Sequence, residues 1–288
     1  MEQFDILIIG AGAAGISAAK AAYSAGCRSI ALVDSKSAMG GVLLQCAHYG
    51  FGKQQNGPEY AAGLLNNFPQ DIHWYPNTMA LEISENKTAL LAGTAVGRKR
   101  IAFRQLILAT GCREIPVGAL LIGGTRPKGI YTAGQMQEMM NLQGILPQGK
   151  AVILGSGDLG LVMAAQLAEV GVSVTLVEQR SRCGGMVHNR RCLQIYPIDL
   201  RCNTTIVEVL GETALEGVRL SDGRIVPCNL LLVAVGLRPE QELIWKLQSP
   251  PWLHLCGNCH AVHPMVEAVV NEGKQAGILA WENIGGGL

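Results

Sequence analysis

The stretch Ile8-Ile9-Gly10-Ala11-Gly12-Ala13-Ala14-Gly15 decides the fold of this 288-residue chain. A GxGxxG run between an apolar segment (Ile6 to Ile9) and an alanine-rich segment is typical of a dinucleotide-binding βαβ unit. The first glycine permits the tight turn, the second lets backbone N–H groups approach a pyrophosphate, and the third lets helix and strand pack closely. We therefore expect the run, namely Gly10, Gly12, Ala14 and Gly15, to bind a dinucleotide.

A second copy of the motif occurs in the other half of the chain, Gly155-Ser156-Gly157-Asp158-Leu159-Gly160. Each copy leads to a second apolar segment that ends in an acid, Asp34 (followed by Ser35) in the first and Glu178 in the second. Such an acid can bind the hydroxyls of an adenosine ribose. Gly155, Gly157, Gly160 and Glu178 thus form a second expected site, and two dinucleotide sites imply two redox partners, most simply a flavin and a nicotinamide.

Glu178 favours NAD(H) over NADP(H), because a carboxylate accepts hydrogen bonds from a free 2′-hydroxyl but repels a 2′-phosphate. Arg180 and Arg182 follow closely in the sequence and keep NADP(H) open as the alternative.

Composition narrows the class of protein. The 23 basic and 22 acidic residues give a formal charge of +1, so nothing indicates a nucleic-acid partner. Charged residues make up only 16% of the chain, which fits buried cofactor surfaces or a face covered by a partner subunit. No apolar stretch is long enough for a transmembrane segment, and Glu2 and Asp5 precede the first apolar run where a signal peptide needs positive charge. These features predict a cytoplasmic protein.

The nine cysteines are expected to be reduced thiols, and their spacing does not predict a metal site. Only Cys256-Gly-Asn-Cys259 has CxxC spacing, without a second pair to complete a zinc or iron–sulfur site. Cys259 lies near an expected helix start, where a thiolate could be stabilised.

Between the motifs, the sequence pattern predicts a regular succession of elements. A helix is expected from Asn56-Gly-Pro-Glu59 onward, then strand-like pieces that form an antiparallel meander over one face of the sheet, and then a buried parallel strand ending at Gly111. The meander pieces are residues 72–75, 79–83, 88–91 and 101–103. Residues 116–129, rich in glycine and proline, are expected to cross between domains. A helix over residues 134–143 and a strand over 230–235 follow, and the tail is expected to return to the first domain with a long helix from about His263.

The order of these motifs resembles the two-dinucleotide flavoproteins related to thioredoxin reductase, in the pyridine nucleotide-disulfide oxidoreductase superfamily. The resemblance covers essentially the whole chain. It implies an α/β fold with two Rossmann-like, three-layer ββα/βαβ domains, an FAD domain over residues 1–117 and 241–288 and an inserted NAD(H) domain over 118–240. It also implies further cofactor-binding residues: Gly41, Thr110, Gly111, Gly236, Gly257 and Asn258.

Several stretches, including residues 41–52, 124–134 and 256–263, resemble one subgroup more narrowly. These are the FAD/NAD-binding subunits that accompany glycerol-3-phosphate-dehydrogenase-like, opine-oxidase-like and cyanide-synthase-like flavoproteins. The resemblance implies hydride transfer between NAD(H) and FAD in an electron-transfer subunit of a multi-component dehydrogenase, as a hetero-oligomer with another flavoprotein subunit. One departure is the short segment 240–255 before the last cofactor motif, which we expect to weaken flavin retention.

Two side chains are candidates for a catalytic role. Cys46 could form a thiolate near the flavin, and His48 could act as an acid or proton relay; His260 and His263 share that possibility. Cys46 also supports an alternative function, a self-sufficient disulfide or small-molecule reductase. The contrasting alternative is a non-catalytic, nucleotide-binding structural subunit.

Overall fold

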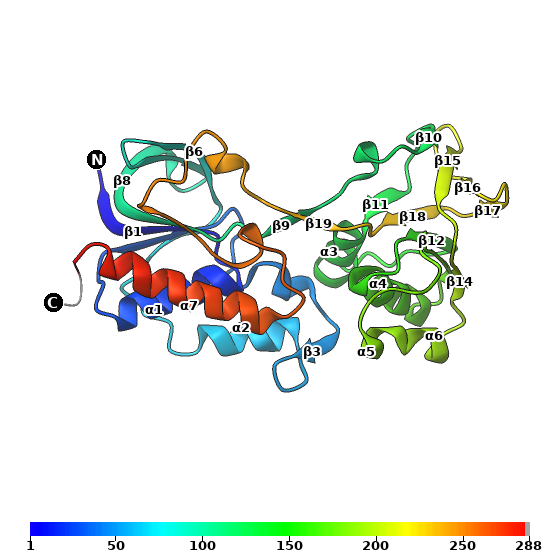
Figure 1. Ribbon diagram of the computed structural model, residues 1–288, viewed down its shortest axis with the longest axis horizontal. Coiled ribbons are helices and arrows are strands. Elements are labelled where there is room, and N and C mark those ends of the chain that lie inside the picture. The colour runs from blue at the N-terminus through cyan, green and yellow to red at the C-terminus, as the bar shows by residue number, and fades with distance from the viewer. Residues whose placement is uncertain (286–288) are drawn as a thin grey trace. The chain divides into compact units, whose positions relative to one another are not determined.

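The computed structural model describes residues 1–285, which divide into two compact units. Unit 1 contains Met1–Arg113 and the returning segment from Arg238, and unit 2 is the inserted Glu114–Leu237. The chain passes from unit 1 to unit 2 after Arg113 and returns after Leu237, a few residues before the boundaries expected after residues 117 and 240. Residues 116–129 therefore belong to unit 2 rather than to the crossing. At the crossings, β9 (Cys112–Glu114) and β19 (Leu237–Pro239) pair with each other (Figure 1).

Five parallel strands form the centre of unit 1, in the order β5-β2-β1-β8-β20. Their bounds are His73–Tyr75 (β5), Ile30–Val33 (β2), Gln3–Ile9 (β1), Gly97–Leu108 (β8) and Leu253–Leu255 (β20). In register, Ile8 lies opposite Leu32 on one side and Ile107 on the other. All three side chains are inaccessible to solvent, as parallel strands covered on both faces require.

An antiparallel meander continues from this sheet through β6 (Thr78–Ser84), β7 (Thr88–Gly93) and the first half of β8. Ile83 and Leu91 of the meander pack on Leu7 and Ile9, so the meander covers one face of the parallel strands, as the sequence predicted. Two details of that prediction were wrong. Residues 73–75 pair in parallel with β2 at the sheet edge, and residues 97–108 form one strand that leaves the meander and enters the parallel sheet.

Helices α1 (Ala13–Ser24) and α7 (Val266–Glu282) cover the other face of the unit 1 sheet, and α2 (Gly57–Leu65) lies beside them (Figure 1). Helix α2 begins as predicted, with a capping box between Asn56 and Glu59. Glycines let α7 approach α1 closely. A Cβ on Gly273 would lie 2.2 Å from the carbonyl oxygen of Ala14, and one on Gly277 would lie 2.2 Å from that of Ala18.

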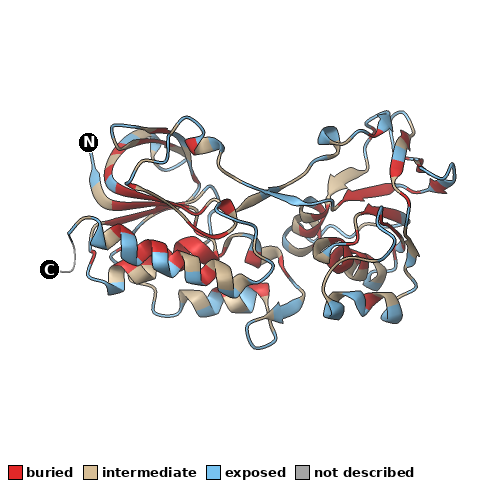
Figure 2. Cartoon of the chain, in the orientation of Figure 1, coloured by how far each residue is buried: buried red, intermediate tan, exposed pale blue. Residues whose placement is uncertain are grey.

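Unit 2 repeats this three-layer plan. Its parallel sheet has the order β11-β18-β12-β13-β14, with bounds Ile130–Thr132, Leu230–Val233, Lys150–Leu154, Ser173–Val177 and Asp199–Arg201. On β12, Ala151 and Ile153 face helices α3 (Ala133–Gln143) and α4 (Asp158–Glu169), whereas Val152 and Leu154 face a small second sheet. That sheet contains β10 (Gly123–Gly124), β15 (Ile206–Leu210), β16 (Gly217–Leu220) and β17 (Ile225–Pro227). Figure 2 shows the buried residues concentrated on the central strands and the adjoining helix faces.

Shorter elements complete the two units: β3 (Tyr49–Phe51), β4 (Gln55–Asn56), α5 (Val187–Arg190), α6 (Cys192–Ile195), and 3-10 turns at Gly41–Gln45, Val117–Ala119, Glu242–Ile244 and Gly257–Cys259. Over residues 1–285, none of the helices combines the length and apolar character that crossing a bilayer requires. The expected α/β architecture, with two Rossmann-like units and one inserted into the other, is confirmed.

Candidate dinucleotide-binding sites

The three glycines of the first fingerprint have distinct surroundings. Gly10 has φ +104°, and a Cβ there would lie 2.2 Å from the carbonyl oxygen of Ala109. A Cβ on Gly15 would lie 1.8 Å from the carbonyl oxygen of Gly10, so both positions exclude any side chain. A Cβ on Gly12 would approach no atom closer than 3.9 Å. Only the second glycine therefore faces open space, as a position reserved for a ligand does.

Gly12 is also the N-cap of α1, so no side chain caps the first turn of that helix. The N–H groups there remain available to an anion, which the helix dipole also attracts. Gly41 (φ +57°) lies next to this turn, because a Cβ on Gly41 would be 2.9 Å from the Cα of Gly12. The neighbouring Gly40 donates its N–H to the carbonyl oxygen of Ala11 at 2.8 Å. These residues fit a pyrophosphate held by backbone alone.

Asp34 follows β2 and is bound to the fingerprint. The N–H of Ala11 donates to its Oδ2 at 2.7 Å, and the N–H of Lys36 donates to its Oδ1 at 2.9 Å. Each carboxylate oxygen has a second lone pair with which it can accept another donor. A pair of ribose hydroxyls matches that remaining capacity. Ser35, the next residue, is exposed.

The second fingerprint repeats the geometry of the first. Gly155 also has φ +104°, and a Cβ there would lie 2.4 Å from the carbonyl oxygen of Ala234. A Cβ on Gly160 would lie 2.1 Å from the carbonyl oxygen of Gly155, whereas a Cβ on Gly157 would have nothing within 4 Å. Gly157 is the N-cap of α4. Unit 2 therefore contains a second strand–turn–helix corner of the same kind, in which only the second glycine again has free space where a Cβ would lie.

Glu178 is more heavily bonded than Asp34. Its Oε2 accepts from the N–H of Ser156 at 3.0 Å and from the Ser156 hydroxyl at 2.5 Å, while its Oε1 accepts from the N–H of Arg180 at 2.9 Å. The same hydroxyl accepts the N–H of Gly184 at 2.8 Å. Ser156 is fully buried and so joins the fingerprint, the acid and the following loop. In unit 1 the corresponding position is Ala11, which has no hydroxyl.

Burial would raise the pKa of Glu178, but the hydrogen bonds from Ser156 and Arg180 outweigh it and lower the pKa below the ordinary value. The side chain is therefore an anion at neutral pH. Only Oε1 keeps an unused lone pair within the described residues, and this atom is the one that can accept a ribose hydroxyl.

The last cofactor motif lies against the first fingerprint. Gly257 has φ +69°, and a Cβ there would lie 2.8 Å from the Cβ of Ala14. The side-chain oxygen of Asn258 accepts the N–H of His263 at 3.0 Å, and its Nδ2 lies 3.8 Å from the Sγ of Cys112. The structure thus brings the loop that carries Asn258 next to Ala14 of the first fingerprint. That both bind one cofactor stays a prediction.

Thr110 and Gly111 follow β8 at the carboxyl end of the sheet. The Thr110 hydroxyl donates to the carbonyl oxygen of Glu240 at 2.7 Å, and the N–H of Glu240 donates to the carbonyl oxygen of Gly111 at 3.0 Å. In unit 2, Gly236 (φ +144°) occupies the matching place after β18. Both glycine corners therefore lie at strand ends, where ligands bind in open α/β sheets.

The two candidate catalytic side chains, Cys46 and His48, lie close together in sequence just before β3. Cys46 is 8% exposed, its Sγ lies 3.2 Å from the carbonyl oxygen of Val42, and burial raises its pKa to about 12. A thiolate is disfavoured there at neutral pH. The His48 ring packs against Phe51 with ring centroids 5.2 Å apart. Catalytic roles for both residues remain predictions.

The two cysteines of the CxxC pair are buried as well. Cys256 and Cys259 are fully buried, and burial raises the pKa of both. The expected thiolate stabilisation at Cys259 is therefore wrong, because it lies in a buried 3-10 turn rather than at the exposed start of a long helix. All nine cysteines fall within residues 1–285 and none forms a disulfide. Nor do His, Cys, Asp and Glu side chains of this part gather into a metal-binding group.

Sequence reasoning did not find Glu272 of α7, which accepts the N–H of Gly257 at 2.8 Å and the Nε2 of His263 at 2.8 Å. It also missed the bridging role of Ser156. A signal existed for each: Gly273 and Gly277 form a small-residue pair opposite the alanines of α1, and Ser156 is the polar counterpart of Ala11.

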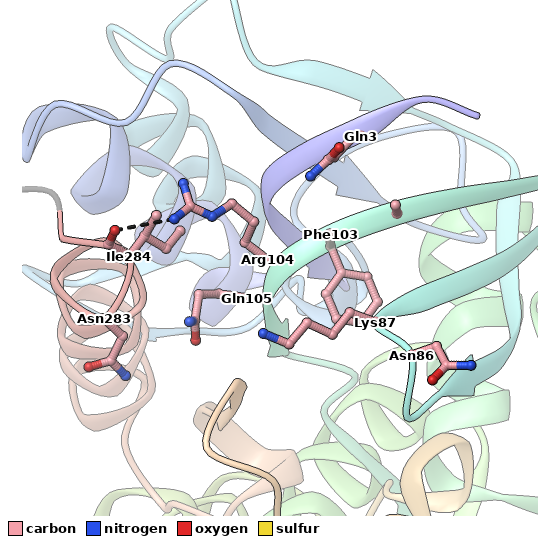
Figure 3. Close-up of a pocket in the computed structure, with 9 residues that line it drawn as sticks. Gln3, Asn86, Lys87, Phe103, Arg104, Gln105, Asn283 and Ile284 are labelled. Carbon is pink, nitrogen blue, oxygen red and sulfur yellow. Dashed lines mark hydrogen bonds between the residues drawn. The ribbon is translucent and has the colours of Figure 1, made fainter.

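One further hollow, of about 340 Å³, lies at the opposite end of β1 from the fingerprint (Figure 3). Gln3, Lys87, Arg104 and Gln105 are among its lining residues, and Arg104 extends to the carbonyl oxygen of Ile284 at 3.3 Å. None of the residues predicted to bind a cofactor lines it.

Comparisons with known proteins give relatives along most of the chain. An opine oxidase component from Agrobacterium tumefaciens is 32% identical over 276 residues, which cover 83% of this chain and 54% of the relative. The ferredoxin reductase component of the 5,5'-dehydrodivanillate O-demethylase of a Sphingobium species is 28% identical over 264 residues, 83% of this chain and 60% of the relative. The chain therefore spans between half and two thirds of the length of these two proteins, each of which is named as a subunit of its enzyme.

Among solved structures, thioredoxin reductase of T. acidophilum matches with a TM-score of 0.77 and 18% identity, over 99% of both chains. The Lactococcus lactis thioredoxin reductase matches with a TM-score of 0.79 and 17% identity, over 97% of this chain and 98% of that one. These likenesses establish the fold. A family model for pyridine nucleotide-disulphide oxidoreductases matches residues 4–250. The resemblance found in the sequence is therefore confirmed, and the chain belongs to the pyridine nucleotide-disulphide oxidoreductase family of FAD- and NAD(P)-binding flavoproteins.

Proposed function

We propose that this chain is an FAD-dependent oxidoreductase in which unit 1 binds FAD, unit 2 binds NAD(H), and hydride passes between the two cofactors. The observation that carries the proposal is the same arrangement in both units. In each fingerprint the first and third glycines are packed against backbone, and only the second has free space where a Cβ would lie. When bound, the cofactors supply the redox chemistry, and the chain supplies binding and orientation.

Four of the predicted residues have the clearest parts in the proposed binding. Gly12 and Gly157 leave room for a pyrophosphate at the first N–H groups of α1 and α4. Asp34 and Glu178 offer carboxylate oxygens to the adenosine riboses. The anionic state of Glu178 supports NAD(H) rather than NADP(H), because it would lie beside the 2′-position.

We further propose that the chain is the electron-transfer subunit of a multi-component dehydrogenase. Two relatives, the opine oxidase component and the ferredoxin reductase component, are by name parts of larger enzymes. The low charge content of this chain also supports a covered surface, and so do exposed apolar side chains such as Trp245 (76% exposed) and Leu121. The raised pKa of Cys46 weighs against the alternative reductase that uses its sulfur.

Anaerobic spectroscopy on the purified chain tests the proposal. The protein should carry FAD, NADH should bleach the flavin band faster than NADPH, and Glu178→Ala should narrow that difference. A colourless protein that still binds NADH would support a non-catalytic nucleotide-binding protein instead. For the subunit role, an affinity-tagged chain should co-purify from its source with a second flavoprotein, and substrate-dependent reduction should require that partner. Efficient turnover of a substrate by the isolated chain would refute the subunit role.

A further inference from the structure

Glu272 is the most heavily bonded acid among the described residues of unit 1. Its Oε2 accepts the backbone N–H of Gly257 at 2.8 Å, and its Oε1 lies 2.8 Å from the Nε2 of His263. The Nδ1 of His260 lies 3.3 Å from the same Oε1. One carboxylate thus contacts three residues of the loop that joins β20 to α7, and Asn258 belongs to this loop.

The position of Glu272 is fixed by its neighbour in sequence. Gly273 packs so closely on α1 that a Cβ would lie 2.2 Å from the carbonyl oxygen of Ala14. Ala14 belongs to the first fingerprint, and its own Cβ would be 2.8 Å from a Cβ on Gly257. The fingerprint, the start of the loop and the middle of α7 therefore meet around Ala14. Glu272 lies beside this contact, because it directly precedes Gly273.

A chain of hydrogen bonds leads from Glu272 to Asn258. The His263 side chain contacts the carboxylate, and the His263 backbone N–H donates to the side-chain oxygen of Asn258 at 3.0 Å. The oxygen thus accepts from His263 and one N–H of the amide is directed at Cys112, so the second N–H of the Asn258 amide is the donor that remains for a ligand. The direction of the amide therefore depends on where the loop is held.

The charge of Glu272 matters to this arrangement. Burial works to raise its pKa, but the hydrogen bonds from Gly257 and His260 and the nearby His263 lower it overall. An anionic carboxylate can accept from several donors at once, whereas a glutamine has one acceptor oxygen. Glutamine keeps one acceptor oxygen for Gly257, and its NH₂ group then faces His263, which can accept it only as the tautomer with an unprotonated Nε2. The substitution therefore removes the negative charge that strengthens both contacts and forces a change in the His263 ring.

We propose that Glu272 is a positioning residue for the flavin, acting through Gly257 and His263 to hold Asn258 against the first fingerprint. The proposal rests on FAD binding to unit 1 as proposed above. Glu272 itself touches no reacting atom. Its contribution is to keep the Asn258 amide directed at the cofactor and so to slow FAD release from a chain whose preceding segment is short.

The test compares Glu272→Gln with Glu267→Gln. Both substitutions remove one negative charge from α7, but Glu267 is exposed and lies in the first turn of the helix. FAD release is followed by the rise of flavin fluorescence on dilution, the flavin absorption bands are recorded, and NADH binding to unit 2 is titrated. Hydrogen bonds to charged groups are strong enough that we expect release from Glu272→Gln to be roughly tenfold to a hundredfold faster. In Glu272→Gln the flavin absorption bands should shift, while the affinity for NADH should equal that of the parent. In Glu267→Gln all three measurements should equal those of the parent.

His263→Ala is the second variant. It removes the imidazole but keeps the backbone N–H that binds Asn258, so we expect FAD release between those of parent and Glu272→Gln. Parental release rates in both variants would overturn the proposal. So would equal losses of FAD affinity and NADH affinity, since they would indicate general destabilisation. A parent protein without FAD would refute the proposed function, and this inference with it, whereas a flavin-loaded parent with an unaffected Glu272→Gln variant would refute the inference alone.

Discussion

Alanine at Gly12 and alanine at Gly15 should impair different properties of the protein, although both residues belong to one fingerprint. A Cβ at Gly12 has open space, with its nearest neighbour at 3.9 Å and an extended backbone (φ −77°, ψ −169°) that alanine tolerates. A Cβ at Gly15 would lie 1.8 Å from the carbonyl oxygen of Gly10, where the helix passes over the strand end. The first substitution should therefore affect binding, and the second should affect folding.

The expected magnitudes follow from these distances. For Gly12→Ala, the gain of about 0.4–1 kcal/mol from a less flexible unfolded chain nearly cancels the cost of about 0.5–1 kcal/mol of replacing an N-cap glycine by alanine. The apoprotein should then unfold within about 2 °C of the parent. The methyl group occupies the approach to the pyrophosphate, and losing one charge-assisted hydrogen bond of about 1.5–3 kcal/mol should weaken FAD binding roughly tenfold to a hundredfold. For Gly15→Ala, overpacking should cost about 1–3 kcal/mol or more.

Two measurements separate the effects. Thermal unfolding of flavin-free protein reports stability, and titration with FAD followed by flavin fluorescence quenching reports affinity. We expect Gly12→Ala to change only the second, and Gly15→Ala to lower the unfolding temperature by several degrees even without flavin. Parental FAD affinity in Gly12→Ala would show that the first fingerprint does not hold the pyrophosphate. Parental stability in Gly15→Ala would refute the packing argument.

Four other predictions concern separate features. Gly157→Ala should weaken NADH binding about tenfold or more and leave FAD content unchanged, as equilibrium dialysis of each cofactor can measure. Ser156→Ala should reduce the preference for NADH over NADPH by roughly two- to tenfold in binding titrations, because it removes one of the bonds that orient Glu178; an unchanged ratio would contradict this role. The pKa of Glu178 is lowered by folding, so its contribution to stability is complete above its ordinary value of 4.5 and is lost as the pH falls through the lower folded value. Urea unfolding between pH 3 and 6 should therefore show a shallower acid decline for Glu178→Gln. In the Cys46→Ser protein, NADH should reduce the flavin at the parental rate, because the Cys46 sulfur is a protonated, buried thiol. A much slower flavin reduction would support the alternative reductase that uses this sulfur.

The parts that local sequence determines were predictable. Each fingerprint places three glycines within six residues, and the closing acid lies at the end of the next strand, so strand, turn and helix are all specified within one βαβ unit. The cap of α2 was readable for the same reason, since Asn56 and Glu59 are three residues apart. In these cases the residues that interact are also close in sequence.

Contacts between distant residues were not predictable in the same way. The strand at residues 73–75 was placed in the meander because its length and composition fit either location, and only pairing with β2 decides between them. Likewise, Glu272 reaches Gly257 because α7 docks on α1, and Ser156 reaches Gly184 across the loop that follows β13. The sequence contains these residues, but their partners depend on how whole elements pack.

The two units also differ in which end of the chain completes their sheets, and this difference explains how one can be inserted into the other. In unit 2, the edge strand β11 and helix α3 precede the fingerprint, whereas in unit 1 the corresponding strand β20 and helix α7 come last. Unit 1 therefore cannot complete its sheet until the chain has passed through unit 2, and the pairing of β9 with β19 keeps the two crossings together. The late return has a functional consequence, because it also delivers Asn258 and Glu272 to the first fingerprint. The proposed flavin site is built from the first fingerprint and the returning segment, so it forms only when that segment has docked. The contact between α7 and α1 is then a condition for the proposed site as well as for the fold.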